Sequence, residues 1–75
     1  MSVLLDMAEV WSNGIDDAID YYEDYLDFSL MTREEFKEEC IKAIAYYFDN
    51  EMLGLEINYR DFVSDTAAAY EIWEG

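Results

Sequence analysis

The sequence predicts an all-α domain, a compact bundle of three or four short helices. Apolar residues recur at three- and four-residue steps along nearly the whole chain, which is the spacing of one face of an α-helix. Two segments match helix-start sequences, and the chain has no proline and only 3 glycines to interrupt a helix. With 75 residues, we expect a single domain, residues 1–75, with a radius of gyration of about 11 Å.

The first apolar stripe lies in the N-terminal residues and is followed by a glycine. Its members are Val3, Leu4, Met7, Val10 and Trp11. Asn13-Gly14 predicts a helix stop, because glycine adopts the left-handed conformation at low cost. A second stripe would then follow, made of Ile15, Ala18, Ile19, Tyr22 and Leu26. A seven-residue spacing in Leu4, Trp11, Ala18 and Tyr25 leaves open the alternative of one continuous helix through Gly14.

The clearest helix start is at Thr32. Thr32 can cap the first free backbone amides while Glu35 reaches back to the Thr32 amide, which makes a capping box. Met31 and Phe36 flank the pair as a hydrophobic staple. The helix is expected to bury Phe36, Cys40, Ala43, Ile44, Tyr47 and Phe48. Its expected end is Leu53-Gly54.

The same start signal recurs more weakly at Asn58. Asn58 is the expected cap, Asp61 follows three residues later, and Ile57 and Phe62 form the staple. The last helix is expected to carry one apolar face made of Tyr59, Phe62, Val63, Thr66, Ala67, Tyr70 and Trp73. A short strand at residues 55–59 is the alternative, although a lone strand would have no partner.

Acidic residues outnumber basic ones by 19 to 4 and histidine is absent, so the formal net charge is −15. Residues 1–32 hold 8 acids and no base (−8), whereas residues 33–75 hold 11 acids and 4 bases (−7). After Thr32, the spacing of Glu34 to Lys37 and of Glu38 to Lys42 predicts ion pairs along a solvated helix face. Residues 1–32 contain no Lys or Arg that could form such pairs with their acids.

Six of these acids crowd into residues 16–27. They are Asp16, Asp17, Asp20, Glu23, Asp24 and Asp27. Like charges four residues apart, such as Asp20 and Asp24, disfavour a helix by about 0.2–0.5 kcal/mol per pair, so folding alone does not explain the pattern. On one straight helix the row would carry a carboxylate per about 3 Å of axis, against one phosphate per about 3.4 Å along a DNA strand.

In these features the chain resembles the small acidic DNA-mimic proteins of bacteriophages that inhibit restriction or CRISPR machinery. The likeness covers the whole chain, which is small, helical, acidic, rich in aromatics and poor in lysine, and it involves no shared motif. It implies inhibition by occupying a nucleic-acid site, whereas the charge spacing alone implies only a basic partner, such as a nucleic-acid-binding protein or complex. The expected partner-binding residues are the six acids and Tyr21, an aromatic anchor beside them.

No active site, metal site or cofactor is expected. Without histidine, Ser-His and Cys-His nucleophiles are excluded, so we expect no catalytic residue and no enzyme activity. Residues 16–20 lack the alternating ligands and the glycine of a calcium-binding loop. Cys40, the 1 cysteine, lies on an apolar stripe and is expected to be a buried small hydrophobe. The negative charge disfavours direct binding to nucleic acid.

The sequence also predicts where the protein acts and leaves some alternatives open. No apolar stretch reaches the roughly 20 residues that span a bilayer and no secretory signal is recognised, so we expect a cytoplasmic protein, in the host cytoplasm if it is phage-encoded. Two other interpretations are an acidic antitoxin, or partner, for a basic toxin and a halophile-type acidic domain without mimicry. A homodimer is a further alternative, because exposed tyrosines and a two-fold axis would extend the acidic row.

Overall fold

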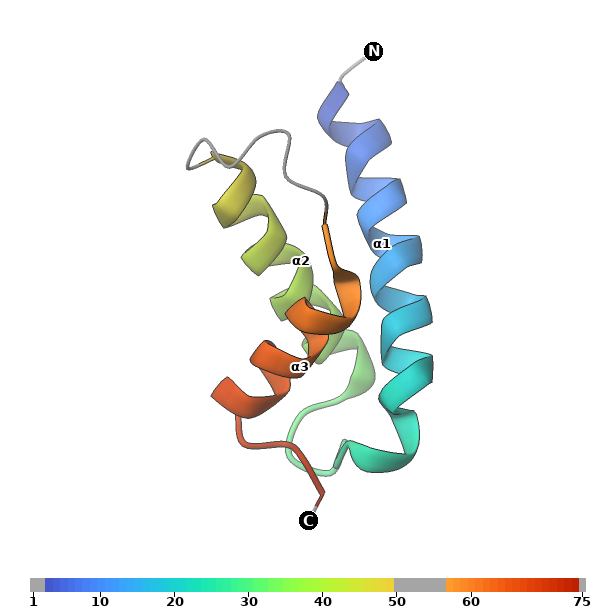
Figure 1. Ribbon diagram of the computed structural model, residues 1–75, viewed down its shortest axis with the longest axis vertical. Helices are drawn as coiled ribbons and strands as arrows, with labels where there is room; N and C mark the ends of the chain where they lie inside the picture. The colour runs from blue at the N-terminus through green and yellow to red at the C-terminus, as the bar shows by residue number, and fades with distance from the viewer. Residues whose placement is uncertain (1–2, 50–56, 75) are drawn as a thin grey trace.

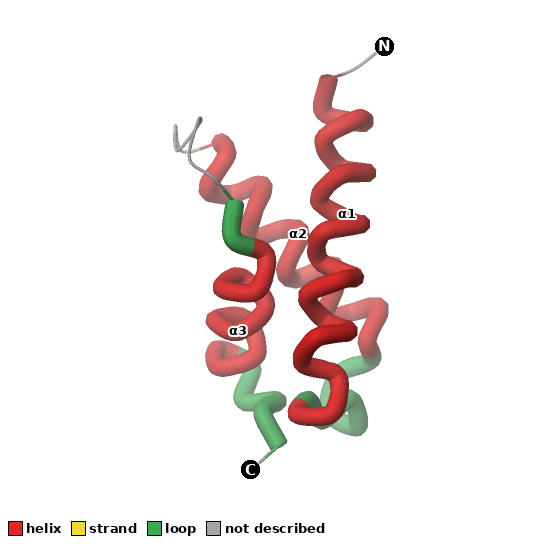
Figure 2. Tube along the Cα trace, turned by 45° about the vertical axis from the view of Figure 1, so that its right-hand side comes forward, coloured by secondary structure: helices red, strands yellow, loops and turns green. Residues whose placement is uncertain are grey.

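The computed structural model describes residues 3–49 and 57–74, which form three α-helices and one 3₁₀ turn (Figure 1). Helix α1 spans Val3–Tyr22, the turn η1 spans Glu23–Tyr25, α2 spans Arg33–Asp49 and α3 spans Tyr59–Ala69. Helices α1 and α3 run in the same direction and α2 runs antiparallel to both, as Figures 1 and 2 show. The predicted all-α bundle is therefore confirmed. The predicted helix end at Leu53-Gly54 lies outside the described residues, as does most of the alternative strand at residues 55–59.

Helix α1 continues without a break through Gly14, so the predicted stop at Asn13-Gly14 is wrong. Gly14 instead permits a close approach between helices. A Cβ at this position would lie 2.5 Å from Cε2 and Cζ of the Tyr59 ring. Because glycine has no side chain, Tyr59 at the start of α3 can rest against α1, and the continuous helix suggested by the seven-residue spacing is the correct alternative.

Both predicted helix starts are present. The Glu35 amide donates to Thr32 Oγ1 (3.2 Å) and the Thr32 amide donates to Glu35 Oε1 (3.2 Å), which completes the capping box of α2. The side chain of Asn58 accepts a hydrogen bond from the Asp61 amide (3.2 Å) and caps α3. These caps satisfy backbone donors that the first turn of each helix leaves free.

Helix α3 ends in a Schellman turn around a left-handed glutamate. Glu71 has a φ of 56°, a conformation usually taken by glycine. The two closing hydrogen bonds run from Ile72 N to Ala67 O (3.0 Å) and from Glu71 N to Ala68 O (3.2 Å). Tyr70 is the C-cap and its side chain is exposed, so its expected place on the apolar helix face is wrong.

A backbone bridge joins the segments that follow α1 and α3. Leu26 pairs with Trp73 in antiparallel orientation. Two hydrogen bonds flank the pair, from Asp27 N to Ile72 O (2.7 Å) and from Glu74 N to Tyr25 O (2.8 Å). Trp73 therefore lies beyond α3, contrary to the prediction, and its ring packs edge-on against Tyr22 with the centroids 5.1 Å apart. The bridge fixes the C-terminal segment to the end of α1.

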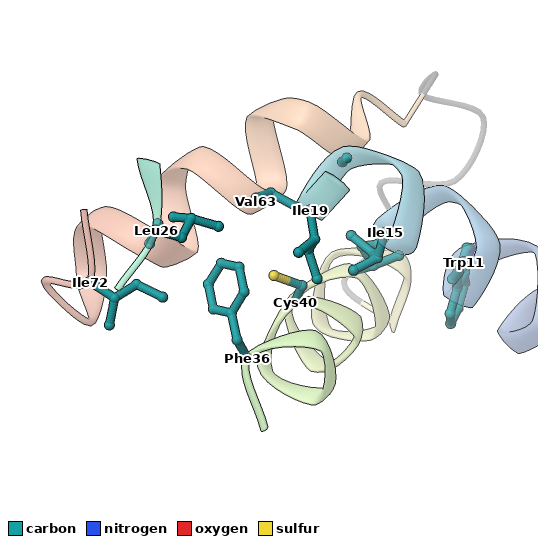
Figure 3. Close-up of a cluster of buried hydrophobic side chains, with 11 residues drawn as sticks. Trp11, Ile15, Ile19, Leu26, Phe36, Cys40, Val63 and Ile72 are labelled. Carbon is teal, nitrogen blue, oxygen red and sulfur yellow. The ribbon is translucent and has the colours of Figure 1, made fainter. Parts of the chain in front are cut away.

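The core lies between the three helices and is closed by the bridge segments (Figure 3). Its buried members are Trp11, Ile15, Ala18, Ile19, Leu26, Phe36, Cys40, Ile44, Val63, Ala67 and Ile72. Cys40 is buried as predicted, and removal from water raises the pKa of its thiol to about 11, so the thiol stays protonated and unreactive at neutral pH. Tyr47 is 46% exposed, contrary to the prediction, because its ring lies at the edge of the core against Phe62.

The molecule is more elongated than its length predicts. Its radius of gyration is 12.4 Å and its principal extents are 40 × 21 × 18 Å. Helix α1 contributes most of this length, because its 20 residues span about 30 Å. None of the described helices, α1 included, combines the length and apolar character needed to cross a membrane.

A candidate acidic binding surface

The six predicted acids of residues 16–27 do not follow one straight helix. Asp16, Asp17 and Asp20 belong to α1, Glu23 and Asp24 to η1, and Asp27 to the loop beyond. The chain leaves the helix because Leu26 adopts an extended conformation (φ −109°, ψ 137°) to pair with Trp73. The prediction of a single rod of evenly spaced charge is therefore wrong, and the six acids divide into groups with different surroundings.

Two of the six acids bind cations of α2. Arg33 Nη2 lies 2.8 Å from Asp20 Oδ1 and 3.7 Å from Asp16 Oδ1, and Lys37 Nζ lies 2.8 Å from Asp16 Oδ2. Lys37 thus crosses to α1 and does not pair with Glu34 in its own helix, contrary to the prediction. These partly exposed pairs contribute about 0–1 kcal/mol each. Asp16 and Asp20 consequently join α1 to α2 and are less available to a partner.

Asp17 and Tyr21 lie on the side of α1 that faces α3. The Arg60 guanidinium carbon is 3.8 Å from the centroid of the Tyr21 ring, so a cation already covers one face of the predicted anchor. Asp17 and Arg60 also line an open groove beside Gly14. Tyr21 still exposes 56% of its surface, and Asp17 is exposed. This part of the predicted site is accessible but is not purely negative.

The remaining acids gather at one end of the bundle, where α1 and α3 both end (Figures 1 and 2). The bridge brings the loop after α1 beside the C-terminal segment. We call the resulting group of carboxylates the acidic end; its members are Glu23, Asp24, Asp27, Glu71 and Glu74. Neither residues 21–32 nor residues 61–74 contain a basic residue. The C-termini of α1 and α3 lie at this end together with the N-terminus of α2. The helix dipoles therefore contribute a net negative charge there.

Asp27 is the most fixed member of the acidic end. Ser29 donates to Asp27 Oδ1 from its hydroxyl (2.5 Å) and from its backbone amide (2.9 Å). The side-chain hydrogen bond, and then the backbone one, lower the pKa of the Asp27 carboxyl from its ordinary value. The carboxylate is therefore held ionised and in one orientation.

Sequence reasoning missed Glu71 and Glu74. The apolar pattern that predicts the last helix runs through the alanines at 67–69 to Trp73, and no glycine marks the end of α3, so Glu71 is expected within a longer helix and Glu74 after its last apolar residue. The left-handed turn at Glu71 has no local signal, because residues other than glycine and asparagine rarely take this conformation. Their position beside Asp24 and Asp27 arises from the bridge, a contact between distant segments.

A hydrogen bond between Glu39 and Tyr70 ties α2 to the end of α3. The Tyr70 hydroxyl donates to Glu39 Oε2 (2.7 Å), and Lys42 Nζ lies 3.2 Å from Glu39 Oε1, not beside Glu38 as predicted. These contacts, with Tyr70 first, lower the pKa of Glu39, and the same hydrogen bond raises the pKa of Tyr70. The described part of the chain holds no group of three residues placed to bind a metal ion.

Comparisons with known proteins found no relative of this chain. No family model matches the chain, and neither the curated proteins nor the solved structures that were searched contain a significant match.

Proposed function

We propose that this protein is a non-enzymatic inhibitor or interaction protein that docks its acidic surface on a basic, nucleic-acid-binding protein or complex. The observation that carries the proposal is the acidic end, where five carboxylates, those of Glu23, Asp24, Asp27, Glu71 and Glu74, share one region without a basic residue in either segment. Like charges brought together oppose folding, so a pattern of this kind is better explained by recognition than by stability.

The bridge gives this surface the rigidity that recognition requires. The backbone hydrogen bonds that flank Leu26 and Trp73 hold the two acidic segments side by side, and Ser29 orients Asp27. Charges that are fixed before binding lose little conformational entropy when a partner docks. A basic partner would be attracted over a distance comparable to the Debye length, about 8 Å at physiological salt, which favours fast association.

In its specific form, the proposal is nucleic-acid mimicry of the kind used by phage anti-restriction and anti-CRISPR proteins. The carboxylates of the acidic end, together with Asp17, would take the places of backbone phosphates in the target's binding groove. Tyr21 and Tyr25, which is 61% exposed, would supply aromatic contact area beside them. Direct binding to nucleic acid or to a membrane is no part of the proposal, and the expected place of action is the cytoplasm.

The decisive experiment measures binding to a candidate restriction or CRISPR effector by calorimetry, with and without competing DNA or guide RNA. We expect affinity to fall steeply between low and high salt, and the nucleic acid to compete with this protein for the effector. Binding that persists in the presence of saturating nucleic acid would contradict mimicry and favour the antitoxin interpretation. Folding only at high salt, without any partner, would favour the halophile interpretation.

Matched charge variants then locate the surface. Asp24→Asn combined with Glu74→Gln removes two charges from the acidic end, and we expect about tenfold weaker binding, which corresponds to about 1.4 kcal/mol. Glu34→Gln combined with Glu38→Gln removes the same charge from the exposed face of α2 and should change affinity by about twofold or less. Equal losses in the two pairs would show that only net charge matters.

A further inference from the structure

A shallow groove lies between α2 and α3. It is lined by the small side chains Ala43, Thr66 and Ala69 and by the rings of Tyr47 and Phe62. The Tyr47 and Phe62 rings meet edge-on, with the centroids 5.5 Å apart. The Glu39–Tyr70 hydrogen bond joins the same two helices nearer the end of α3. The groove is therefore bounded by contacts between α2 and α3, and most of the surface that lines it is apolar.

The size of the groove suits one side chain. Its volume is about 250 Å³, whereas pockets for small-molecule ligands usually measure about 300–1,000 Å³. The walls of this groove also expose mostly apolar atoms. A cofactor or substrate is consequently a poor fit, and a flexible side chain with an apolar stem fits well.

The charge of the residues that line the groove indicates which kind of side chain would bind there. Asp61 and Asp65 line the groove from α3, both are exposed, and neither forms an ion pair within residues 57–74 or with the described part of α1 and α2. Lys42, the nearest base along α2, pairs with Glu39. Groove and rim together are complementary to a cation on an apolar stem.

The molecule already shows how an aspartate pair at this spacing holds a cation. Asp16 and Asp20 stand four residues apart on α1, as Asp61 and Asp65 do on α3, and they share Arg33 from α2 at 3.7 and 2.8 Å. Arg60 adds an example of a guanidinium over a tyrosine ring. Arginine suits both features better than lysine, because its planar fork binds two carboxylate oxygens and stacks on aromatic rings.

We propose that the groove between α2 and α3 is a docking site for one arginine side chain of a basic partner protein, with its methylenes on Ala43 and Ala69 and its guanidinium between Asp61 and Asp65. The inference rests on the proposed function only for the sign of the partner's charge. A second copy of this chain is a poorer occupant, because each copy carries a charge of −15 and its arginines are engaged internally.

The test uses the full chain and three blocked amino acids: N-acetyl-arginine methylamide, its lysine counterpart, and its citrulline counterpart, which keeps the stem of arginine and replaces the guanidinium by an uncharged group. Two-dimensional NMR titration should show saturable amide shifts at Phe62, Asp65 and Thr66 with the arginine probe, on the millimolar scale. The lysine probe should bind several-fold more weakly, and the citrulline probe should cause no comparable shift.

Two pairs of variants separate the groove from general attraction. Ala69→Leu fills the groove and should weaken arginine binding about tenfold, whereas Ala68→Leu, on the neighbouring exposed position outside the groove, should leave it unchanged. Asp65→Asn should weaken binding about as much, and Asp24→Asn at the acidic end should not. Leucine and asparagine at these exposed positions preserve the helix, and thermal unfolding of each variant checks this.

Three outcomes would contradict this inference. Equal shifts with the lysine probe, or equal losses from Asp24→Asn and Asp65→Asn, would show attraction to net charge without a groove. Shifts of the same amides on concentrating the protein alone would make the groove a contact between copies. If the arginine probe saturates the groove but the protein does not bind an effector in competition with DNA, the proposed function is wrong and this inference stands. If the protein binds the effector in competition with DNA but the arginine probe does not bind, this inference is wrong and the proposed function stands.

Discussion

Carboxylates have opposite surroundings at the contact between α1 and α2 and at the acidic end. Between the helices, each aspartate finds a cation: Asp20 binds Arg33, and Asp16 is shared by Arg33 and Lys37. At the acidic end, the five carboxylates have no Lys or Arg in their two segments. The few cations of this chain are thus used for internal contacts, and the charge that remains on the surface is nearly all negative.

The sequence has 4 basic residues, and each has an internal contact: Arg33 and Lys37 with α1, Lys42 with Glu39, and Arg60 with the Tyr21 ring. Partly exposed pairs of this kind contribute little to stability individually. Their larger effect is on the surface, because cations that are engaged in internal contacts leave most of the surface carboxylates without a cation of their own.

The largest expected effect comes from breaking the apolar support of the acidic end. Ile72→Ala removes a side chain that is 1% exposed, and we expect the free energy of unfolding to fall by about 2–5 kcal/mol. Amides of the bridge, such as Asp27 N, should then exchange faster with solvent. Urea denaturation and hydrogen exchange provide the measurements.

A milder substitution of Ile72 and a substitution at an exposed position test the same contribution of apolar burial. Ile72→Val should cost about 1 kcal/mol if the alanine variant does not fold, and Leu30→Ala, at a side chain that is 71% exposed, should change stability by about 0.5 kcal/mol or less. An Ile72→Ala protein as stable as the Leu30→Ala protein would show that the bridge is not held by apolar burial.

Removing the shared cation tests the other region. Arg33→Gln leaves Asp16 and Asp20 facing each other with Lys37 alone, and we expect a loss of about 1 kcal/mol that shrinks at high salt. Urea denaturation at two ionic strengths measures it. Glu38→Gln, at an exposed position beyond the first turn of α2, is the control and should change stability by about 0.5 kcal/mol or less. A loss that does not depend on salt would contradict an electrostatic role.

At the acidic end, one substitution should stabilise the fold by a similar amount. Glu71→Gly relieves a left-handed conformation and removes a negative charge near a helix C-terminus, and we expect a gain of about 1 kcal/mol in thermal unfolding. Glu71→Gln removes the charge and keeps the strained backbone, so it should give less than half of that gain. If both variants gain equally, repulsion and not backbone strain is what Glu71 contributes.

The smallest effect concerns the pH dependence of the Glu39–Tyr70 pair. The lowered pKa of Glu39 contributes stability above the ordinary value of 4.5, and this is lost as pH falls through the lowered pKa. The raised pKa of Tyr70 contributes stability below 10.0, which is lost as pH rises through the raised pKa. In Tyr70→Phe, site-resolved NMR titration should show the Glu39 pKa moving up toward 4.5, whereas Tyr46→Phe should leave it in place.

Local signals in the sequence predicted the helix starts well. The Thr32–Glu35 capping box and the Asn58 cap depend on residues three positions apart, and both form as expected. Apolar periodicity likewise identified most of the core, including Phe36, Cys40 and Val63. These features depend on contacts within one or two helical turns, which a sequence displays directly.

Features that depend on distant contacts were predicted poorly. Gly14 gives the local signal of a helix stop, but a glycine is needed there because the Tyr59 ring at the start of α3 packs directly against it. Lys37 pairs with Asp16 across the bundle although Glu34 is available nearby, and the bridge at Leu26 ends the charged helix early. The acidic character of the surface was therefore predictable from composition, whereas its shape and members required the tertiary structure.

The internal use of the cations also has a consequence for chemical cross-linking. Lys37 and Lys42 are the 2 lysines of the sequence and both already contact carboxylates, so reagents that couple amines to amines would find few lysine amines on this protein. A carbodiimide, which joins a carboxylate directly to an amine, would instead activate Asp24 and Glu74 and link them to lysines that a bound partner brings into contact. Mass spectrometry of the linked peptides would then identify the partner and map the docking orientation together.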